Sequence, residues 1–291
     1  MHIVVPFGAG GVQDILARAI SAELGTALGK SVIVENRPGA GGTIGTGYVA
    51  KSAPDGNTLV LSAASHTIAG SLYAKLPYDP IADFTGVAHI GTIDYVLMVN
   101  SGMKAASVKE FIALLKANPG KYNYASAGNG SATHLSMAYF NGLAGTEMVH
   151  IPYKATGEAV QEVLAGRAQA VISGTIGAIP FAKDPRVRLL GVTGAQRSKF
   201  LPELPTVGES LPGYVFDSWL GLLGPKAMPR RTAEEIDAAV HKLLKDPVIL
   251  ERLAKQGVEP KALGVDEFNA LLKADFQKMA KVVKASGARI D

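Results

Sequence analysis

The stretch of the sequence best suited to chemistry is a glycine-rich segment near the amino terminus, Pro-Phe-Gly-Ala-Gly-Gly at residues 6–11. A β-branched run at residues 3–5 precedes it, and apolar side chains follow at helical spacing from Leu16 to Leu28. The first N–H groups of a helix have no internal partner, and the aligned peptide dipoles leave partial positive charge there. Glycines also let a ligand approach the main chain. The segment is therefore typical of an anion-binding loop.

Nucleotide binding is the main alternative for this loop. The dinucleotide pattern G-x-G-x-x-G starts at Gly8 and Gly10, but its third glycine would fall at Gln13. Glu35 lies about where a ribose-binding acid would, and we interpret it as a charge at the end of a strand. No Gly-Lys-Ser/Thr follows the glycines, which excludes a P-loop. A nucleotide- or phosphate-binding α/β enzyme that uses this loop stays the alternative prediction.

A second loop of the same kind, Ser-Ala-Gly-Asn-Gly-Ser-Ala-Thr-His, covers residues 126–134. A predicted strand at residues 122–125 leads into it, and a predicted helix with Leu135 and Met137 follows. Thr133 stands at the start of this helix, where its hydroxyl points in the same direction as the first-turn donors. Two such units predict two similar lobes whose helix starts face one cleft.

Strands alternate with helices along the chain, which predicts an α/β fold with mostly parallel sheets and helices on both faces. Residues 63–67 are predicted to form a polar loop at the carboxyl end of a strand, where open α/β sheets bind ligands. Strands are predicted at residues 3–5, 32–34, 58–62, 95–99, 122–125, 148–151, 170–173, 189–193 and 218–222. In addition to the helix with Leu16 to Leu28 and the helix with Leu135 and Met137, helices are predicted at residues 43–52, 108–118, 156–165, 232–244, 247–256 and 265–286.

The composition is that of a folded globular protein without disulfides. The chain has 291 residues, 47% of them hydrophobic, and no cysteine. Its net charge of +4 comes from scattered lysines and arginines, and only 7% of residues are aromatic, so no nucleic-acid partner is expected. No apolar run is long enough to span a membrane. The chain opens almost directly on a strand, so we expect that a signal peptide has been removed.

Catalytic motifs are missing from the sequence. It has no cysteine nucleophile, no G-x-S-x-G elbow and no H-E-x-x-H helix, and its six histidines show no metal-ligand spacing. Ser131 and His134 lie one helical turn apart, but no acid is placed to orient the histidine. We therefore predict a binding protein rather than an enzyme, with no metal and no cofactor.

Several motifs recur together, in a fixed order, from the first strand to the last helix. They are Pro-Phe-Gly-Ala-Gly-Gly with Asp14, Glu-Asn-Arg-Pro-Gly-Ala-Gly-Gly at 35–42, Pro-Asp-Gly at 54–56, Tyr-Asp-Pro at 78–80, Tyr-Ala-Ser-Ala-Gly-Asn-Gly at 124–130, Thr-His-Leu at 133–135, Pro-Tyr-Lys at 152–154 and Ser-Trp at 218–219. In this combination the chain resembles the Bug proteins, the solute receptors of the tripartite tricarboxylate transporters.

The resemblance implies a type II periplasmic binding protein of two α/β lobes with a ligand cleft between them. We expect residues 1–100 with 220–291 to form the first lobe and residues 101–219 the second. A receptor of this kind binds a small organic acid and hands it to the membrane subunits of its transporter. We expect a periplasmic monomer; a sensor subunit that binds the same acids is an alternative that the sequence does not separate from it.

The resemblance also implies how the ligand is held. In the family, the two glycine loops bind one carboxylate with backbone amides, hydroxyls and bridging water. Asp14 is expected to contribute its N–H, because its own charge would repel the ligand. Carried onto this chain, the carboxylate site consists of Phe7, Gly10, Gly11 and Asp14 on one side and of Asn129, Ser131, Thr133 and His134 on the other.

Further positions are candidates for the rest of the ligand. Ser65 and His66, on the predicted strand-end loop, are expected to touch its distal part, unless His66 is an ordinary surface histidine. Trp219, the only tryptophan, either lines the cleft beside a crossover or belongs to the core. Lys154 and Arg167 are interpreted as solvated surface charges.

Two departures from the family pattern bear on the ligand. Gln13 replaces a common threonine and is expected to change the near wall of the pocket. Ser173, which is also a candidate ligand contact, and Gly174 stand where many members carry Asp-Asn, and an acid there could pair with a ligand ammonium. We therefore expect a dicarboxylate, hydroxy acid or aromatic carboxylate rather than an amino acid.

Overall fold

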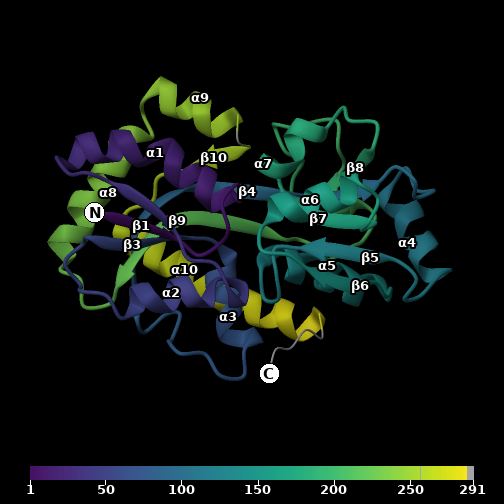
Figure 1. The fold of residues 1–291 in the computed structure, drawn as a ribbon, viewed down its shortest axis with the longest axis horizontal. Helices are drawn as coiled ribbons and strands as arrows, with labels where there is room; N and C mark the ends of the chain where they lie inside the picture. Colours follow the sequence, from purple (N-terminus) through teal and green to yellow (C-terminus); the bar gives the residue numbers. More distant parts are fainter. Residues whose placement is uncertain (256, 287–291) are drawn as a thin grey trace.

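The computed structural model describes residues 1–255 and 257–286, which form two α/β lobes joined by a shared sheet (Figure 1). The strands are β1 (His2–Val5), β2 (Ile33–Asn36), β3 (Thr58–Ser62), β4 (Phe84–Asn100), β5 (Asn123–Ser126), β6 (Val149–Pro152), β7 (Ala170–Gly174), β8 (Val187–Val192), β9 (Asp217–Pro225) and β10 (Val258–Pro260). The helices are α1 (Val12–Leu28), α2 (Thr43–Ala50), α3 (Ala64–Leu72), α4 (Val108–Lys116), α5 (Ala132–Ala144), α6 (Thr156–Leu164), α7 (Thr175–Ala178), α8 (Arg230–Leu243), α9 (Pro247–Lys255) and α10 (Val265–Ser286). Short 3₁₀ turns are η1 (Ala40–Gly42), η2 (Ile179–Phe181) and η3 (Val207–Glu209).

The long strand β4 belongs to the sheets of both lobes. The strand order is β2-β1-β3-β9-β4-β7-β5-β6, and β8 and β10 also pair with β4. Asp94 of β4 lies opposite Asp217 of β9, whereas the next residue, Tyr95, lies opposite Gly174 of β7. One continuous strand therefore carries the chain from the first lobe into the second.

The prediction of mostly parallel sheets was wrong at the centre of the molecule. Pairing is parallel between β1 and its neighbours β2 and β3, and between β5 and its neighbours β6 and β7. The strand β4 is antiparallel to β7, β8, β9 and β10, and β9 is antiparallel to β3. The reason is that β4 and β9 connect the lobes, and each runs in the direction opposite to that of the strands beside it.

Alternation along the strands sets the two apolar layers of the first lobe. Ile3 and Val5 pack in one core cluster with α1 and α8, whereas Val4 packs in another with Trp219 and Phe268. Successive residues of a strand point to opposite faces, so a fully apolar strand supplies both layers. The helices α1, α8 and α9 lie above this sheet in the view of Figure 1, and α2 and α10 lie below it.

The last helix, α10, ties the lobes together. It runs beneath both lobes in Figure 1, against α3 on one side and α5 on the other. Its Met279 and Val283 share a buried cluster with Ile68 of α3 and Phe140 of α5. Burial of such side chains contributes about 1.5–3 kcal/mol each, so α10 stabilises the contact between the lobes.

The chain is helical where the sequence predicted a loop after β3. Residues 63–67 do not form a loop, because Ala64–Leu72 is the helix α3 and starts directly after β3. Gln256, the predicted last residue of a helix, and residues 287–291 of the predicted first lobe lie outside the described residues. The short helix α7 and the strand β10 were not predicted, and β4 starts at Phe84, eleven residues before the predicted strand at 95–99.

Candidate functional site

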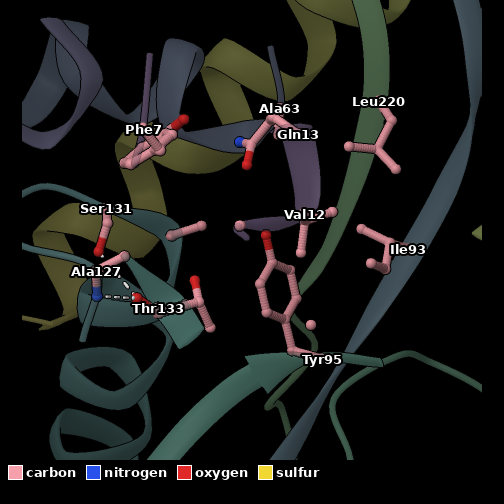
Figure 2. A pocket seen from close by; sticks show the side chains of 15 residues that line it. Phe7, Val12, Gln13, Ala63, Ile93, Tyr95, Ala127, Ser131, Thr133 and Leu220 are labelled. Carbon is pink, nitrogen blue, oxygen red and sulfur yellow. Dashed lines mark hydrogen bonds between the residues drawn. The ribbon is translucent and has the colours of Figure 1, made fainter. Parts of the chain in front are cut away.

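A small cavity, here called the inner cavity, lies between the two lobes (Figure 2). It encloses about 30 Å³, which is room for little more than one water molecule. No lysine or arginine is among the described residues that line it. These are Phe7, Gly11, Val12, Gln13, Ala63, Ser65, Ile93, Tyr95, Ala127, Ser131, Ala132, Thr133, Thr156, Gly174 and Leu220.

Four helix starts meet at the inner cavity. The sequence predicted two of them, the starts of α1 at Val12 and of α5 at Ala132, and the structure brings both to one cavity. Ser65 in the first turn of α3 and Thr156 at the start of α6 also line it. Each helix start presents unpaired N–H groups and partial positive charge. The cavity is therefore suited to an anion although no cationic side chain reaches it.

The carboxylate of Asp14 holds the first loop and does not face the cavity. It accepts hydrogen bonds from the Gly10 N–H at 2.9 Å, from Arg18 Nε at 2.9 Å and from Asn36 Nδ2 at 3.0 Å. Asn36 Nδ2 also donates to the Phe7 carbonyl at 3.0 Å. Burial raises the pKa of Asp14, but these bonds and the Arg18 charge outweigh it, so the pKa lies below its ordinary value.

These contacts decide which amides of the first loop are free. The Gly10 N–H is bonded to Asp14, so Gly10 has no amide to offer and does not line the inner cavity. Gly11 does line it, as do Val12 and Gln13 in the first turn of α1. The N–H of Asp14 belongs to the same turn, which has no intrahelical partners. Asp14 itself is not among the residues that line the inner cavity, so its role as an amide donor stays a prediction.

The second loop is held by hydroxyl groups. Ser131 caps α5 by accepting the His134 N–H at 3.2 Å, and Thr133 Oγ1 accepts the Ala127 N–H at 2.9 Å. The two hydroxyls lie 3.0 Å apart and share one hydrogen bond. Of their two protons one is used in this bond. The other is left for a ligand, whichever hydroxyl carries it.

His134 supports the loop from behind and is not among the residues that line the inner cavity. Its Nδ1 accepts the Gly130 N–H at 3.2 Å, and its ring stacks on His150 with 4.1 Å between centroids. The Nε2 of His150 is hydrogen-bonded to Ser126 Oγ at 2.6 Å. Burial lowers the pKa of His134 to about 4, and burial together with His134 lowers that of His150 to about 3. Both rings are therefore neutral near pH 7.

Asn129 lies outside the inner cavity, in a larger outer compartment. This compartment encloses about 420 Å³ and shares Phe7 and Ala127 with the inner cavity. The lobes touch beside it, where the Tyr73 hydroxyl lies 2.7 Å from the Ala40 carbonyl and 3.1 Å from that of Asn129. It is lined by Phe7, Pro38, Gly39, Ala40, Gly41, Gly42, Ala127, Gly128, Asn129, Tyr153 and Lys154.

The pair Ser65–His66 divides between cavity and core. Ser65 lines the inner cavity, and its hydroxyl has no hydrogen bond with any described residue. His66 is buried instead among aromatic side chains, with Nε2 2.7 Å from the Pro80 carbonyl and its ring edge-on to Phe84. Burial lowers the pKa of His66 to about 4. It is neither a surface histidine nor a residue that lines the cavity.

Strand alternation turns Ser173 and Trp219 away from the inner cavity. Gly174 and Leu220, their neighbours along β7 and β9, line it. Trp219 packs on the opposite layer, where its Nε1 donates to Asp275 Oδ2 at 2.9 Å. Of the two interpretations of this tryptophan, the structure agrees with a place in the core.

Sequence reasoning missed several residues of the inner cavity. Tyr95 and Ile93 come from β4, and Tyr95 points its hydroxyl into the cavity in Figure 2. Its position at the start of a predicted strand was the only available signal. Thr156 was visible only as the first residue of a predicted helix. The two cations considered in the sequence lie outside the inner cavity. Arg167 forms an ion pair with Glu162 at 2.6 Å, and Lys154 lines the outer compartment but not the inner cavity.

Comparison with known proteins decides the family. The family described as tripartite tricarboxylate transporter family receptor matches residues 16–288. The chain belongs to this family. In the part of the receptor that the structure describes, no helix is both long and apolar enough to cross a membrane.

Solved structures of similar proteins agree over nearly the whole receptor. The periplasmic binding protein BugD superimposes with a TM-score of 0.94 at 30% identity, over 99% of this chain and 98% of its own. Rpa4515 of R. palustris with adipate superimposes with a TM-score of 0.94 at 30% identity, over 100% of this chain and 98% of its own. MatC of Rhodopseudomonas palustris with bound malate superimposes with a TM-score of 0.91 at 30% identity, over 97% of this chain and 98% of its own.

These comparisons confirm the predicted family and the two-lobe α/β fold of a periplasmic binding protein. The receptor is a periplasmic solute-binding protein of this family. Both the family and its structural neighbours are binding proteins rather than enzymes.

Proposed function

We propose that the receptor captures a small carboxylate by closing its lobes over it and delivers it to the membrane subunits of a tripartite tricarboxylate transporter. The observation that supports this most directly is the meeting of four helix starts, with the Ser131–Thr133 hydroxyl pair, at a cavity without a cationic side chain. The receptor acts as a monomer in the periplasm. Residues 1–100 with 220–291 and residues 101–219 are the two lobes that move.

The proposed carboxylate site needs no arginine fork. Hydrogen bonds to a charged group contribute about 1.5–3 kcal/mol each. A micromolar ligand needs about 8 kcal/mol, so several such bonds suffice after ordering costs. The donors are the first-turn amides of α1, including that of Asp14, and the free proton of the Ser131–Thr133 pair. The Gly11 N–H already donates to the Gly8 carbonyl at 3.4 Å, so Gly11 lines the site without supplying a free donor.

The other predicted residues receive separate roles in this proposal. Phe7 and Ser65 form walls of the bound site, and Asn129 lies at its entrance in the outer compartment. Gly10 and His134 position the two loops through their hydrogen bonds. Roles as ligand contacts are withdrawn for the residues that face away from the inner cavity, which are His66, Ser173 and Trp219.

The proposed ligand is a dicarboxylate, a hydroxy acid or an aromatic carboxylate, and not an amino acid. Ser173 and Gly174 bring no acid to pair with an ammonium group, and none of the residues that line the inner cavity is acidic. The structural neighbours were solved with adipate and with malate, which are a dicarboxylate and a hydroxy dicarboxylate. Both facts support an acid without an amino group.

Calorimetry with Ser131→Ala tests the carboxylate site. Malate, adipate, benzoate, aspartate and glutamate are titrated into the wild type and the variant. We expect micromolar binding of at least one acid without an amino group, weakened about tenfold to a hundredfold by the substitution. The variant also loses a helix cap, worth about 1 kcal/mol of stability.

The matched control is Ser107→Ala. Ser107 caps α4 by accepting the Glu110 N–H at 3.2 Å, the same distance as in the Ser131 cap, but it does not line the inner cavity. It should lower the melting temperature similarly and leave affinity unchanged. Micromolar binding of aspartate would refute the ligand class. Thermal stabilisation by ATP or NADH, with none by the acids, would favour the nucleotide-using enzyme instead.

A further inference from the structure

We propose that Gln13 sets the length of the bound acid and contacts its second polar group, which restricts the ligand to short aliphatic dicarboxylates and hydroxy acids. This inference rests on the proposed function and narrows its ligand class. Gln13 lies in the first turn of α1, and Figure 2 shows its carboxamide inside the inner cavity, directed towards Phe7. The carboxamide has no hydrogen bond with any described residue.

The lobes already touch, so further closure makes no room for a ligand. Tyr73 bridges the carbonyls of Ala40 and Asn129 across the cleft. A Cβ at Gly41 would collide with the Asn129 carbonyl, and its φ of 62° favours glycine. With the lobes in contact as they are here, an inner cavity of about 30 Å³ gains space for a ligand through the movement of a side chain.

Gln13 is the side chain most free to move. Tyr95 is fixed by edge-on packing against Phe216, with 5.5 Å between centroids. Phe7 is buried against the backbone of Gly42. Gln13 is unbranched and unpaired, so it swings aside at little cost and stays beside the ligand. A longer acid would require more space than this movement supplies.

The residues that line the inner cavity also indicate where the second polar group of the ligand lies. The Ser65 hydroxyl is unpaired at a residue that is only 5% exposed and lines the same cavity as Gln13. Together they can donate to a second carboxylate or accept from a hydroxyl. Figure 2 places the apolar side chains of Val12, Ile93 and Leu220 away from the Ser131 side. Uncompensated charge there would be costly, so the second polar group turns to Gln13 and Ser65.

Titration of succinate, malate, glutarate and adipate tests the inference. The wild type should bind succinate or malate at least about tenfold more tightly than adipate. In Gln13→Ala the preference for succinate or malate over adipate should decrease about tenfold, because the shorter side chain lengthens the cavity. Gln13→Met preserves size but not polarity, so it should keep the length preference and weaken binding of diacids about tenfold. Gln13→Glu places a negative charge beside the second carboxylate and should abolish measurable binding of diacids.

Gln161→Ala, an exposed glutamine on α6, is the control and should change nothing. Equal melting temperatures will show that the variants fold. A succinate-to-adipate ratio unmoved in Gln13→Ala overturns the role of Gln13, and tight binding of benzoate by the wild type overturns the restriction to short aliphatic acids. Either result leaves the proposed function intact. Only the absence of binding by every acid tested would remove the proposed function itself.

Discussion

The loop that starts α1 is held by charged groups, whereas the loop that starts α5 is held by hydroxyls and imidazoles. We call the first set, Asp14 with Arg18 and Asn36, the charged brace. We call the second set, Ser126 with His134 and His150, the neutral brace. Both braces fix glycine amides of their loops: Asp14 accepts the Gly10 N–H, and His134 accepts the Gly130 N–H.

The difference teaches what a site for an anion tolerates. A carboxylate near a bound acid is repulsive unless its charge is offset. In the first lobe, Arg18 and the amino-terminal end of α1 offset Asp14. The neutral brace contains no cation, and it achieves the same support with groups that carry no charge at neutral pH.

The largest expected effect comes from breaking the charged brace with Asp14→Ala. The change removes the acceptor for Gly10, Arg18 and Asn36 and leaves the first loop unsupported. We expect a loss of about 3 kcal/mol in the free energy of unfolding and at least a hundredfold weaker ligand binding, measured by denaturant unfolding and calorimetry.

Asp14→Asn is the matched control for the charge. It keeps an acceptor for the Gly10 N–H and should recover a large part of both losses. If Asp14→Ala binds ligand as tightly as the wild type, then the charged brace does not position the loop.

A smaller effect is expected for the neutral brace in His150→Ala. It removes the hydrogen bond to Ser126 and the stacking on His134, so we expect about 1–2 kcal/mol less stability and about tenfold weaker binding. Ser126→Ala breaks the same hydrogen bond from its other end.

The double variant of His150 and Ser126 should therefore cost less than the sum of the two single changes, which a double-mutant cycle in denaturant measures. Strict additivity would show that the two residues do not act as one brace.

The smallest effect concerns pH and separates the braces without truncating either. Unfolded histidine takes up a proton near its ordinary pKa of 6.5, whereas the pKa of His134 is about 4 and that of His150 about 3. As the pH falls from 6.5 towards 4 the unfolded state gains protons first, so stability decreases over this window. The depressed pKa of Asp14 makes the charged brace lose its contribution only below about pH 3.8.

Melting temperatures recorded between pH 7 and pH 4 should therefore fall less steeply in His150→Gln than in the wild type. Equal slopes would mean that His150 titrates normally and is not held neutral by the fold.

The sequence by itself determined the two glycine loops, the alternation of strands and helices, and the residues at the helix starts. Ser131 and Thr133 were predictable because a helix start fixes locally where hydroxyls and N–H groups point. The order of motifs identified the family for the same reason, since each motif is a short local solution for a turn or a loop.

Only the tertiary structure decided which neighbour faces the cavity. Leu220 lines it and Trp219 does not, and Ser65 lines it whereas His66 is buried among aromatic rings. A one-residue difference along a strand reverses the side that a residue faces, and no local pattern in an apolar strand records which side holds the ligand. The starts of α3 and α6 join the site for a related reason. They reach it because β4 and β9 run antiparallel between the lobes and bring distant segments together, and that arrangement depends on packing over the whole chain.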